Sequence, residues 1–392
     1  MMYSMDNKEV NKIIGKTLLD IAESIEKGDF SRKIVVGITT LGSEHGVENL
    51  VKGAEVAAKK HNDIKVVLIG PKVDTELEIV EANEEDEMYN KMEELLDTKY
   101  IDAAVTMHYN FPIGVSTVGK VVTPADGKEM FLATTTGTAS MNRTEAMIKN
   151  AVYGIITAKT MGIKEPNVGI LNLDGARQVE KALKELDKNG YKINFANSLR
   201  ADGGSVMRGN DLLKGTPDVM VTDTLTGNLL MKVFSSYTTG GSYEGFGYGY
   251  GPGIGEDYER NILILSRASG VPVVANAIEY AKDLVKGNIN KLIKEEFKKA
   301  NEAKLKDILS SIENKEDKKI KDEEEVPMPT KEIATASISG IDVMDIEDAQ
   351  KTLWKEGIYA EGGMGCTGPV IKVNDKNYDK AAEILTEKGF IA

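Results

Sequence analysis

Residues 33–70 carry the pattern that decides the fold, KIVVGITTLGSEHGVENLVKGAEVAAKKHNDIKVVLIG. A β-branched run is followed by a glycine-containing loop, a segment with apolar residues at helical spacing (residues 47–60), and a second β-branched run. Continuous apolar runs of this length are typical of strands that are buried on both faces of a parallel sheet. We therefore predict a strand–helix–strand unit in which the helix connects two parallel strands.

The same alternation returns farther along the chain. Further strands are expected at residues 101–107, 130–134, 167–172, 218–223 and 271–276, and further helices at residues 88–96, 146–161 and 176–188. Strands that alternate with helices form largely parallel sheets with helices on both faces, so the predicted fold class is α/β. Ligands are expected at the carboxyl ends of the strands, where loops lead into helix N-termini.

The pattern changes towards the C-terminus. Residues 280–312 are rich in Lys and Glu at helical spacing, and 11 of the 13 residues from 313 to 325 are charged, which is typical of a solvated segment. Strand and helix patterns resume near residue 331. We predict an α/β domain at residues 1–288, a charged helix and linker at residues 289–330, and a small tethered α+β domain at residues 331–392.

Composition excludes several classes of protein. The 392 residues carry a net charge of −13, so nucleic acid, which is bound by clustered basic residues, is not an expected partner. The single cysteine, Cys366, indicates a reducing compartment. The first residues lack a signal-peptide pattern, and no apolar run approaches the roughly 18 residues that a membrane span requires. We expect a cytoplasmic protein without a membrane span.

Cys366 lies in the segment GGMGCTGP, residues 362–369. Backbone N–H groups in a glycine-rich turn can lower the pKa of a thiol and stabilise an oxyanion, which favours a nucleophilic or acyl-carrying cysteine. The other interpretation is an inert cysteine that behaves as a small apolar residue. Under the first interpretation the candidate oxyanion-hole backbone groups belong to Gly363, Gly365, Thr367 and Gly368.

Three loops offer hydroxyl and N–H groups at a predicted helix start, an arrangement that can bind an anion. They follow the first strand, the strand at residues 130–134 (with Arg143 nearby) and the strand at residues 218–223. The same groups are equally typical of helix caps, and a lysine one turn into a helix is commonly solvated. The candidate phosphate- or substrate-binding residues are Gly42, Ser43, Glu44, His45, Asp223, Thr226, Gly227, Asn228 and Lys232.

The sequence does not match the residue spacing of the common nucleotide-, dinucleotide- and metal-binding motifs. Gly114 begins a stretch that is similar to a P-loop, but Val121 stands where Ser or Thr would bind Mg²⁺. The glycines of residues 245–255 occupy only odd positions and cannot form G-x-G-x-x-G, so we expect a flexible loop or lid there. The three histidines, at positions 45, 61 and 108, lack metal-binding spacing, so neither a metal nor a cofactor is expected.

Several segments resemble, in order and spacing, the phosphate acyltransferases of bacterial phospholipid synthesis, which make acyl phosphates from acyl thioesters. They are GITTLGSEHGVENLVKGAE, IKVVLIG, IDAAVTM, PNVGILNLDG and GNDLLKGTPDVMVTDTLTGNLLMK. The resemblance covers residues 33–288, with the stretch through Asp223, Gly227, Asn228 and Lys232 as its most specific part. Two features depart from that family: its Asp-Ala-Met-Gly-Gly-Asp loop is TTLGSE here, at residues 39–44, and it has no tethered cysteine-bearing domain.

Both departures are typical of the component C alpha subunits of glycine reductase complexes, phosphate-acyltransferase relatives from amino-acid-fermenting anaerobes, which the chain resembles over nearly its whole length. The resemblance implies an acetyl group that comes from a carboxymethylated selenoprotein A through a ketosynthase-like beta subunit. It also implies that Cys366 is the essential thiol, and that phosphate releases the acetyl group as acetyl phosphate. Whether the complex uses glycine, sarcosine or betaine stays open.

The chemistry fits the parts of this sequence. Phosphorolysis of a thioester needs an anion site, an oxyanion hole and a good leaving group, but no metal, because phosphate is already a nucleophile at neutral pH. A tether would let one domain carry Cys366 between a partner and the phosphate site. Two alternatives remain open at this point: a free-standing phosphate acyltransferase that uses coenzyme A or carrier-protein thioesters, and a non-catalytic scaffold subunit.

Overall fold

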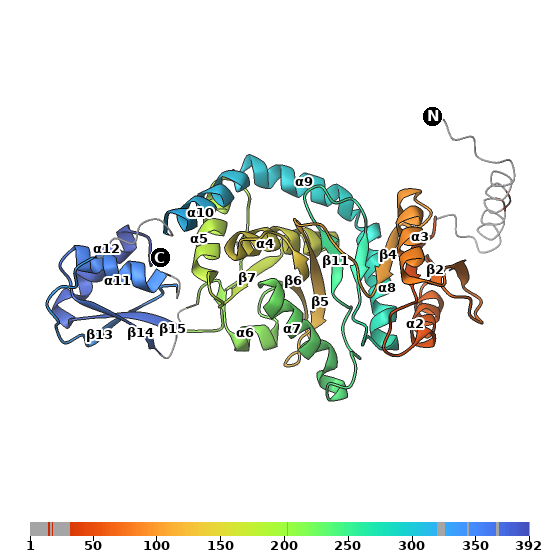
Figure 1. The fold of residues 1–392 in the computed structure, drawn as a ribbon, viewed down its shortest axis with the longest axis horizontal. Helices are drawn as coiled ribbons and strands as arrows, with labels where there is room; N and C mark the ends of the chain where they lie inside the picture. Colours follow the sequence, from red (N-terminus) through yellow and green to blue (C-terminus); the bar gives the residue numbers. More distant parts are fainter. Residues whose placement is uncertain are drawn as a thin grey trace.

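The computed structural model describes residues 32–201, 203–319, 326–342, 345–365 and 368–391, together with Gly15 and Leu18. A 12-stranded, mostly parallel sheet forms the large domain, and a 3-stranded antiparallel sheet forms a small C-terminal domain. Figure 1 shows the small domain at one end of the molecule, beyond helix α10 (Leu305–Lys319). The α/β class and the small α+β C-terminal domain are thereby confirmed.

The first half of the large sheet contains parallel strands in the order β3-β2-β1-β4-β12. These strands are β1 (Ile34–Thr39), β2 (Ile64–Gly70), β3 (Glu78–Glu81), β4 (Ala103–Thr106) and β12 (Ile262–Ile264). Helices α2 (Val47–Lys60) and α8 (Val271–Lys286) pack into the core on one face, and α3 (Glu85–Asp97) packs into the core on the other. The predicted strand–helix–strand unit at residues 33–70 is confirmed.

The second half of the sheet is also parallel, but it runs the opposite way. Its strands are β6 (Glu129–Thr138), β7 (Asn167–Leu171), β8 (Asn194–Phe195), β9 (Val206–Met207) and β10 (Val219–Val221). Between the halves, β5 (Val115–Val122) and β11 (Gly251–Ile254) are each antiparallel to both neighbours. Three successive reversals place the carboxyl ends of the two halves at opposite edges of the sheet.

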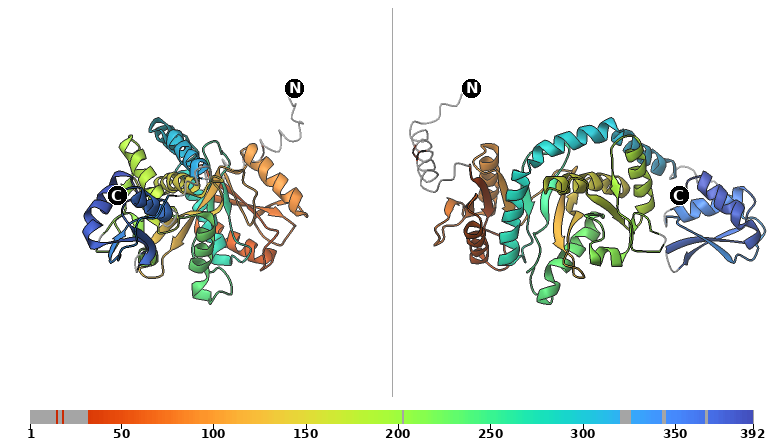
Figure 2. Two further views of the ribbon diagram at one scale, coloured as in Figure 1. Left: turned by 60° about the vertical axis from the view of Figure 1, so that its left-hand side comes forward. Right: turned by 180° about the vertical axis from the view of Figure 1, so that it is seen from behind.

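Helices cover both faces of the second half as well (Figure 2). On one face lie α4 (Arg143–Thr160), α5 (Ala176–Lys188), α9 (Ile289–Glu302) and α10, and on the other lie α6 (Gly209–Lys214) and α7 (Thr224–Ser236). Helices α9 and α10 contribute buried apolar residues to the core of the large domain. Among the helices of the described residues, none has both the length and the apolar character needed to cross a bilayer.

Two predictions about local structure are wrong. Residues 271–276 form the start of α8 rather than a strand, because Pro272 fits the first turn of a helix and the apolar pattern continues for 16 residues, too far for a strand. Residues 251–254, predicted as part of a loop or lid, form the central strand β11. Gly251 makes this possible: a Cβ atom there would lie 1.8 Å from the carbonyl oxygen of Val118 on β5.

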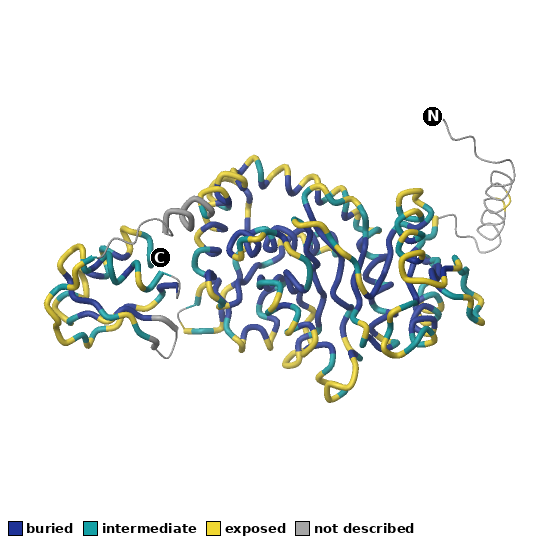
Figure 3. The backbone as a smooth tube through the Cα atoms, viewed as in Figure 1, coloured by how far each residue is buried: buried dark blue, intermediate teal, exposed yellow. Residues whose placement is uncertain are grey.

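The small domain has its own apolar core, separate from the core of the large domain (Figure 3). Its strands are β13 (Ala336–Ser339), β14 (Ala360–Gly365) and β15 (Gly368–Val373), and its helices are α11 (Ile346–Lys355) and α12 (Tyr378–Glu387). The predicted glycine-rich turn is wrong in its extent, because Gly362, Gly363 and Gly365 belong to β14 and Gly368 begins β15. Cys366 and Thr367 lie outside the described residues.

Candidate functional site

The loop after β1 is held by backbone contacts with the segment after β12. It turns at Gly42 and at Gly46, whose φ angles are 92° and 80°, and leads into α2. The Ser43 hydroxyl accepts a hydrogen bond from the His45 N–H at 3.1 Å. The Glu44 N–H donates to the carbonyl of Arg267 at 2.9 Å. Two segments that lie more than 200 residues apart in the sequence therefore form one edge of the site.

Helix α7 reaches this edge with its C-terminal half. The His45 ring packs edge-on against Tyr243, with centroids 6.0 Å apart, and the N–H of the next residue, Glu244, donates to Ala268. Lys232 Nζ lies 3.6 Å from a carboxylate oxygen of Glu244, which is 2% exposed. We call Ser43, Glu44, His45, Lys232, Tyr243, Glu244 and Arg267 the His45 cluster. Lys232 is therefore paired with a buried carboxylate, while its own side chain stays 54% exposed.

Arg267 is the residue of the His45 cluster that sequence reasoning missed. It is exposed, it follows β12, and its carbonyl binds the candidate loop. Burial raises the pKa of Tyr89, and the positive charge of Arg267 opposes this rise. The sequence does contain a pattern for β12 and the loop after it: a short apolar run, ILIL, followed by Ser266 and Arg267. A strand of three residues gives only a weak pattern, so it was not predicted.

Asp223 holds the N-terminus of α7 instead of presenting a free group to a ligand. One carboxylate oxygen accepts from the Thr226 N–H at 2.9 Å, and the other accepts from the Thr226 hydroxyl at 2.9 Å and from Arg143 at 2.8 Å. Burial opposes ionisation of Asp223, but these hydrogen bonds and the Arg143 charge prevail and lower its pKa. Asp223 is therefore a charged helix cap that also anchors Arg143.

Gly227 and Asn228 attach α7 to β6. A Cβ atom at position 227 would lie 1.7 Å from the carbonyl oxygen of Thr134, so only glycine permits this approach of helix and strand. Asn228 Nδ2 donates to the carbonyl of Thr135 at 3.0 Å. The family-like stretch from Asp223 to Asn228 thus has a structural role as well as its predicted role in binding. We call Arg143, Asp223, Thr226, Gly227 and Asn228 the Asp223 cluster.

The structure does not bring the predicted phosphate-binding residues together in one place. Asp223 and Lys232 are nine residues apart along α7, which corresponds to about 13.5 Å along a helix axis. A single phosphate ion cannot contact the His45 cluster and the Asp223 cluster at the same time. The reversal of strand direction at β5 and β11 is the cause, because it places the two loops at opposite edges of the sheet.

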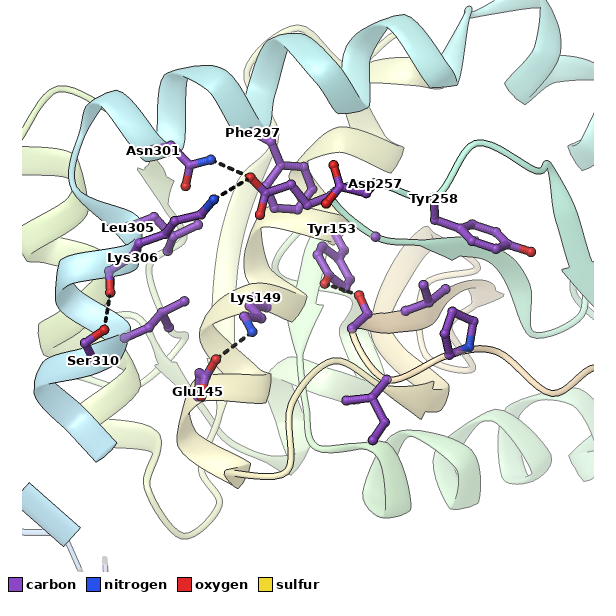
Figure 4. A pocket seen from close by; sticks show the side chains of 17 residues that line it. Glu145, Lys149, Tyr153, Asp257, Tyr258, Phe297, Asn301, Leu305, Lys306 and Ser310 are labelled. Carbon is purple, nitrogen blue, oxygen red and sulfur yellow. Dashed lines mark hydrogen bonds and ion pairs between the residues drawn. The ribbon is translucent and has the colours of Figure 1, made fainter. Parts of the chain in front are cut away.

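A cavity of about 540 Å³ lies between α4, α9, α10 and the segment after β11, and its lining includes Glu145, two positions along α4 from Arg143. Figure 4 shows that its polar side chains mostly bind one another: Lys149 pairs with Glu145 at 2.5 Å, and Lys306 lies 3.1 Å from Glu256. None of the predicted site residues lines this cavity. The two clusters at the ends of α7, rather than this cavity, match the motifs of the sequence.

Comparison with known proteins identifies the class. The model of a family described as fatty acid synthesis protein matches residues 34–372. The chain is homologous to phosphate acyltransferases; that of Campylobacter concisus is 27% identical over 334 residues, covering 67% of this chain and 98% of that enzyme. A branched-chain phosphotransacylase structure from Enterococcus faecalis is 19% identical, with a TM-score of 0.46, and covers 64% of this chain and 99% of that chain.

A second relative defines the group within the class. The glycine/sarcosine/betaine reductase complex component C subunit alpha of Peptoclostridium acidaminophilum is 66% identical over 384 residues, which is 98% of this chain and 100% of that protein. The chain therefore belongs to the fatty acid synthesis protein family and, within it, to the component C alpha subunits. The family relationship predicted from the sequence is confirmed.

Proposed function

We propose that this protein is the acyltransferase subunit of a glycine, sarcosine or betaine reductase complex, and that it releases acetyl phosphate from an enzyme-bound acetyl thioester. The observation that carries the proposal is the 66% identity over 98% of the chain, because a match of that length includes the small domain as well as the large one. Its partners would be the ketosynthase-like beta subunit, selenoprotein A and inorganic phosphate, in the cytoplasm.

The proposed step is phosphorolysis of an acetyl thioester on Cys366. A phosphate oxygen attacks the acetyl carbonyl carbon, the new C–O bond forms, the C–S bond breaks, and the electron pair leaves with sulfur as a thiolate. The products are acetyl phosphate and free Cys366. Backbone N–H groups at Gly363, Gly365, Thr367 and Gly368 are proposed to stabilise the carbonyl oxygen while it carries negative charge.

We assign phosphate to the His45 cluster. The N-terminus of α2 has no side-chain cap, Ser43 brings a hydroxyl group to the loop, and Arg267 is an exposed guanidinium beside it. In the Asp223 cluster, by contrast, Arg143 is already bound to Asp223 and lies 3.6 Å from Asp174. Glu44 has the same sign of charge as phosphate, and the N–H groups of Glu44, His45 and Gly46 are bonded within the protein. The loop would therefore bind phosphate through the backbone at Gly42 and through the side chains of Ser43 and His45.

The assignment predicts that Arg267→Ala raises the KM for phosphate in the assembled complex. A charge-assisted hydrogen bond is worth about 1.5–3 kcal/mol, so the expected rise is about 10- to 100-fold. Arg267→Lys is the matched control, and it should recover part of the affinity because it restores the charge without the planar fork. Steady-state kinetics with varied phosphate gives the result, and an unchanged KM in Arg267→Ala would remove Arg267 from the site.

Trapping the intermediate tests the proposed function directly. If the complete complex turns over without phosphate, the peptide that contains Cys366 should gain the mass of one acetyl group, and added phosphate should remove that mass. Hydroxylamine should also remove it, because thioesters react with this nucleophile. Mass spectrometry of the digested subunit gives the answer. A Cys366 peptide that stays unmodified while acetyl phosphate is produced on adding phosphate rules out the proposed intermediate.

A second function has a specific observation in its favour. The Campylobacter phosphate acyltransferase is matched over 98% of its length, so nearly all of that protein has a counterpart within this chain. A free-standing phosphate acyltransferase would turn over long acyl thioesters of coenzyme A or carrier protein as an isolated chain. Assay of the isolated subunit with such thioesters separates the two functions. An unreactive Cys366 together with no phosphate binding would instead support a scaffold subunit.

A further inference from the structure

The small domain contacts the large domain through polar groups at the start of α5. Helix α5 begins after Gly175, which provides no side-chain cap, and its first turn contains no acidic residue. Two carboxylates from the small domain occupy this position. Asp342 Oδ1 accepts from the Gly175 N–H at 3.3 Å, and the Asp345 carboxylate accepts from Gln178 Nε2 at 3.3 and 3.2 Å. A helix N-terminus favours negative charge, so charge and hydrogen bonding act together here.

A third contact lies farther along the same helix. Lys181 Nζ lies 3.4 Å from the carbonyl oxygen of Gly389, close to the end of α12. The three contact points on the large domain, at positions 175, 178 and 181, are spaced by three residues and so follow one side of α5. The small domain therefore contacts α5 through two of its own segments, one before α11 and one after α12. Contacts from two segments fix an orientation, whereas a single contact would leave the domain free to rotate.

The described contacts between the domains are polar rather than apolar. The buried apolar residues of the small domain form a cluster of their own, which shares no member with the two clusters of the large domain. Interfaces without an apolar core are typically weak, and salt also screens the attraction between a carboxylate and a helix N-terminus. Asp342 is 5% exposed in the docked position, so its carboxylate depends on the groups around it to offset the loss of water. Docking of this kind can be reversed at low cost.

The docking point lies beside the Asp223 cluster. Asp174 directly precedes Gly175, and its carboxylate lies 3.6 Å from Arg143, which in turn binds Asp223 at the start of α7. Helix α10 precedes the tether to the small domain and packs in the same core as α5. A released small domain would therefore stay close to its docking site, at high effective concentration.

We propose that the first turn of α5 is a reversible docking site for the small domain, and that Asp342 and Asp345 are positioning residues that hold this domain beside the Arg143 end of α7. Docking would hold the domain that carries Cys366 at the opposite end of α7 from the His45 cluster, and release would free the domain to reach bound phosphate or a partner. The docking itself stands on the contacts above. Its effect on acetyl transfer rests on the proposed function.

The first measurement concerns shape and uses the full-length chain. Small-angle X-ray scattering of the wild-type protein should give a compact particle near 0.1 M salt and a longer maximum dimension near 1 M, where the Debye length falls from about 10 to about 3 Å. The double variant Asp342→Ala, Asp345→Ala should be extended at both salt concentrations. Glu347→Ala is the matched control, because it removes an exposed charge from the first turn of α11 and should behave as wild type.

A variant on the large-domain side of the contact separates loss of docking from misfolding of the small domain. Gln178→Glu places a carboxylate against Asp345 and should also extend the particle, although it leaves the small domain unchanged. Folding of the small domain is checked by the fluorescence of Trp354, the single tryptophan, whose Nε1 donates to Ala360. A double variant that is folded and stays as compact as wild type at low salt would overturn the docking site.

The second measurement concerns transfer in the reconstituted complex. Undocking should raise the rate of acetyl phosphate release at saturating phosphate by up to about tenfold, because docked molecules must first release the small domain before Cys366 can reach the His45 cluster. The KM for phosphate should stay unchanged, since the His45 cluster is not altered. An extended double variant with the wild-type rate would overturn the positioning role. If the wild-type complex forms no acetyl phosphate, the proposed function fails, and the scattering experiment still decides the docking.

Discussion

Replacing Cys366 by alanine should reduce acetyl phosphate release by the reconstituted complex at least a thousandfold, because a covalent carrier cannot be bypassed by binding energy alone. The large domain, including the His45 cluster, should keep its fold and its affinity for phosphate. Loss of release together with intact phosphate binding is the result that distinguishes a missing acyl carrier from a damaged phosphate site.

Two further variants make this experiment specific. Met364→Leu removes the neighbouring sulfur while it keeps the bulk of the side chain, and should retain wild-type release. Cys366→Ser offers a hydroxyl group, which is a weaker nucleophile and a poorer leaving group, so at most a trace of activity is expected. The measurement is acetyl phosphate formed per complex with selenoprotein A and the beta subunit present. Release at the wild-type rate from Cys366→Ala would show that the acetyl group never rests on this sulfur.

Helix bounds were predicted well where the residues that determine them lie within one short segment of the sequence. Helices α2 and α5 begin and end at the predicted residues, because their apolar spacing, glycines and polar flanks all lie within one short segment. The start of α7 was equally readable, since Asp223 followed by Thr226 is a helix-capping pattern. These predictions needed no knowledge of the partners that each element would meet.

The arrangement of the site was not predicted, because it depends on long-range pairing. Strands β5 and β11 reverse the sheet direction, and β11 is a glycine-rich segment with little strand character. Without that reversal, all strand ends would share one edge, and the loops at Gly42 and Asp223 would be neighbours. Neither hydrophobic periodicity nor a sequence motif can predict this reversal of strand direction, because it depends on the close approach of Gly251 to Val118 on a distant strand. For the same reason Arg267 was missed, although it lies next to the predicted loop.

The substitution Gly227→Ala is expected to lower the stability of the large domain more than any other change considered. The Cβ position of residue 227 lies 1.7 Å from the Thr134 oxygen, 2.6 Å from the Thr222 hydroxyl and 2.8 Å from the Thr134 carbonyl carbon. Two of these are backbone atoms of β6, which cannot rotate away as the end of a side chain can, so Gly227→Ala must push α7 off the sheet. Overpacking in a core costs about 1–3 kcal/mol and occasionally more, and we expect the upper part of that range.

Gly209→Ala is the matched control, because Gly209 also lies in a helix and no atom is found within 4 Å of its Cβ position. It should be neutral or slightly stabilising, since alanine favours the helix. In thermal unfolding followed by far-UV circular dichroism, the midpoint temperature of Gly227→Ala should be about 5–10 °C below that of the wild type, because each kcal/mol shifts it by about 2–4 °C in domains of this size. Trp354 lies in the small domain, so its fluorescence transition should not move. Equal melting of Gly227→Ala and Gly209→Ala would mean that α7 does not pack against β6 as closely as described, and the separation of the two clusters along α7 would then lose its basis.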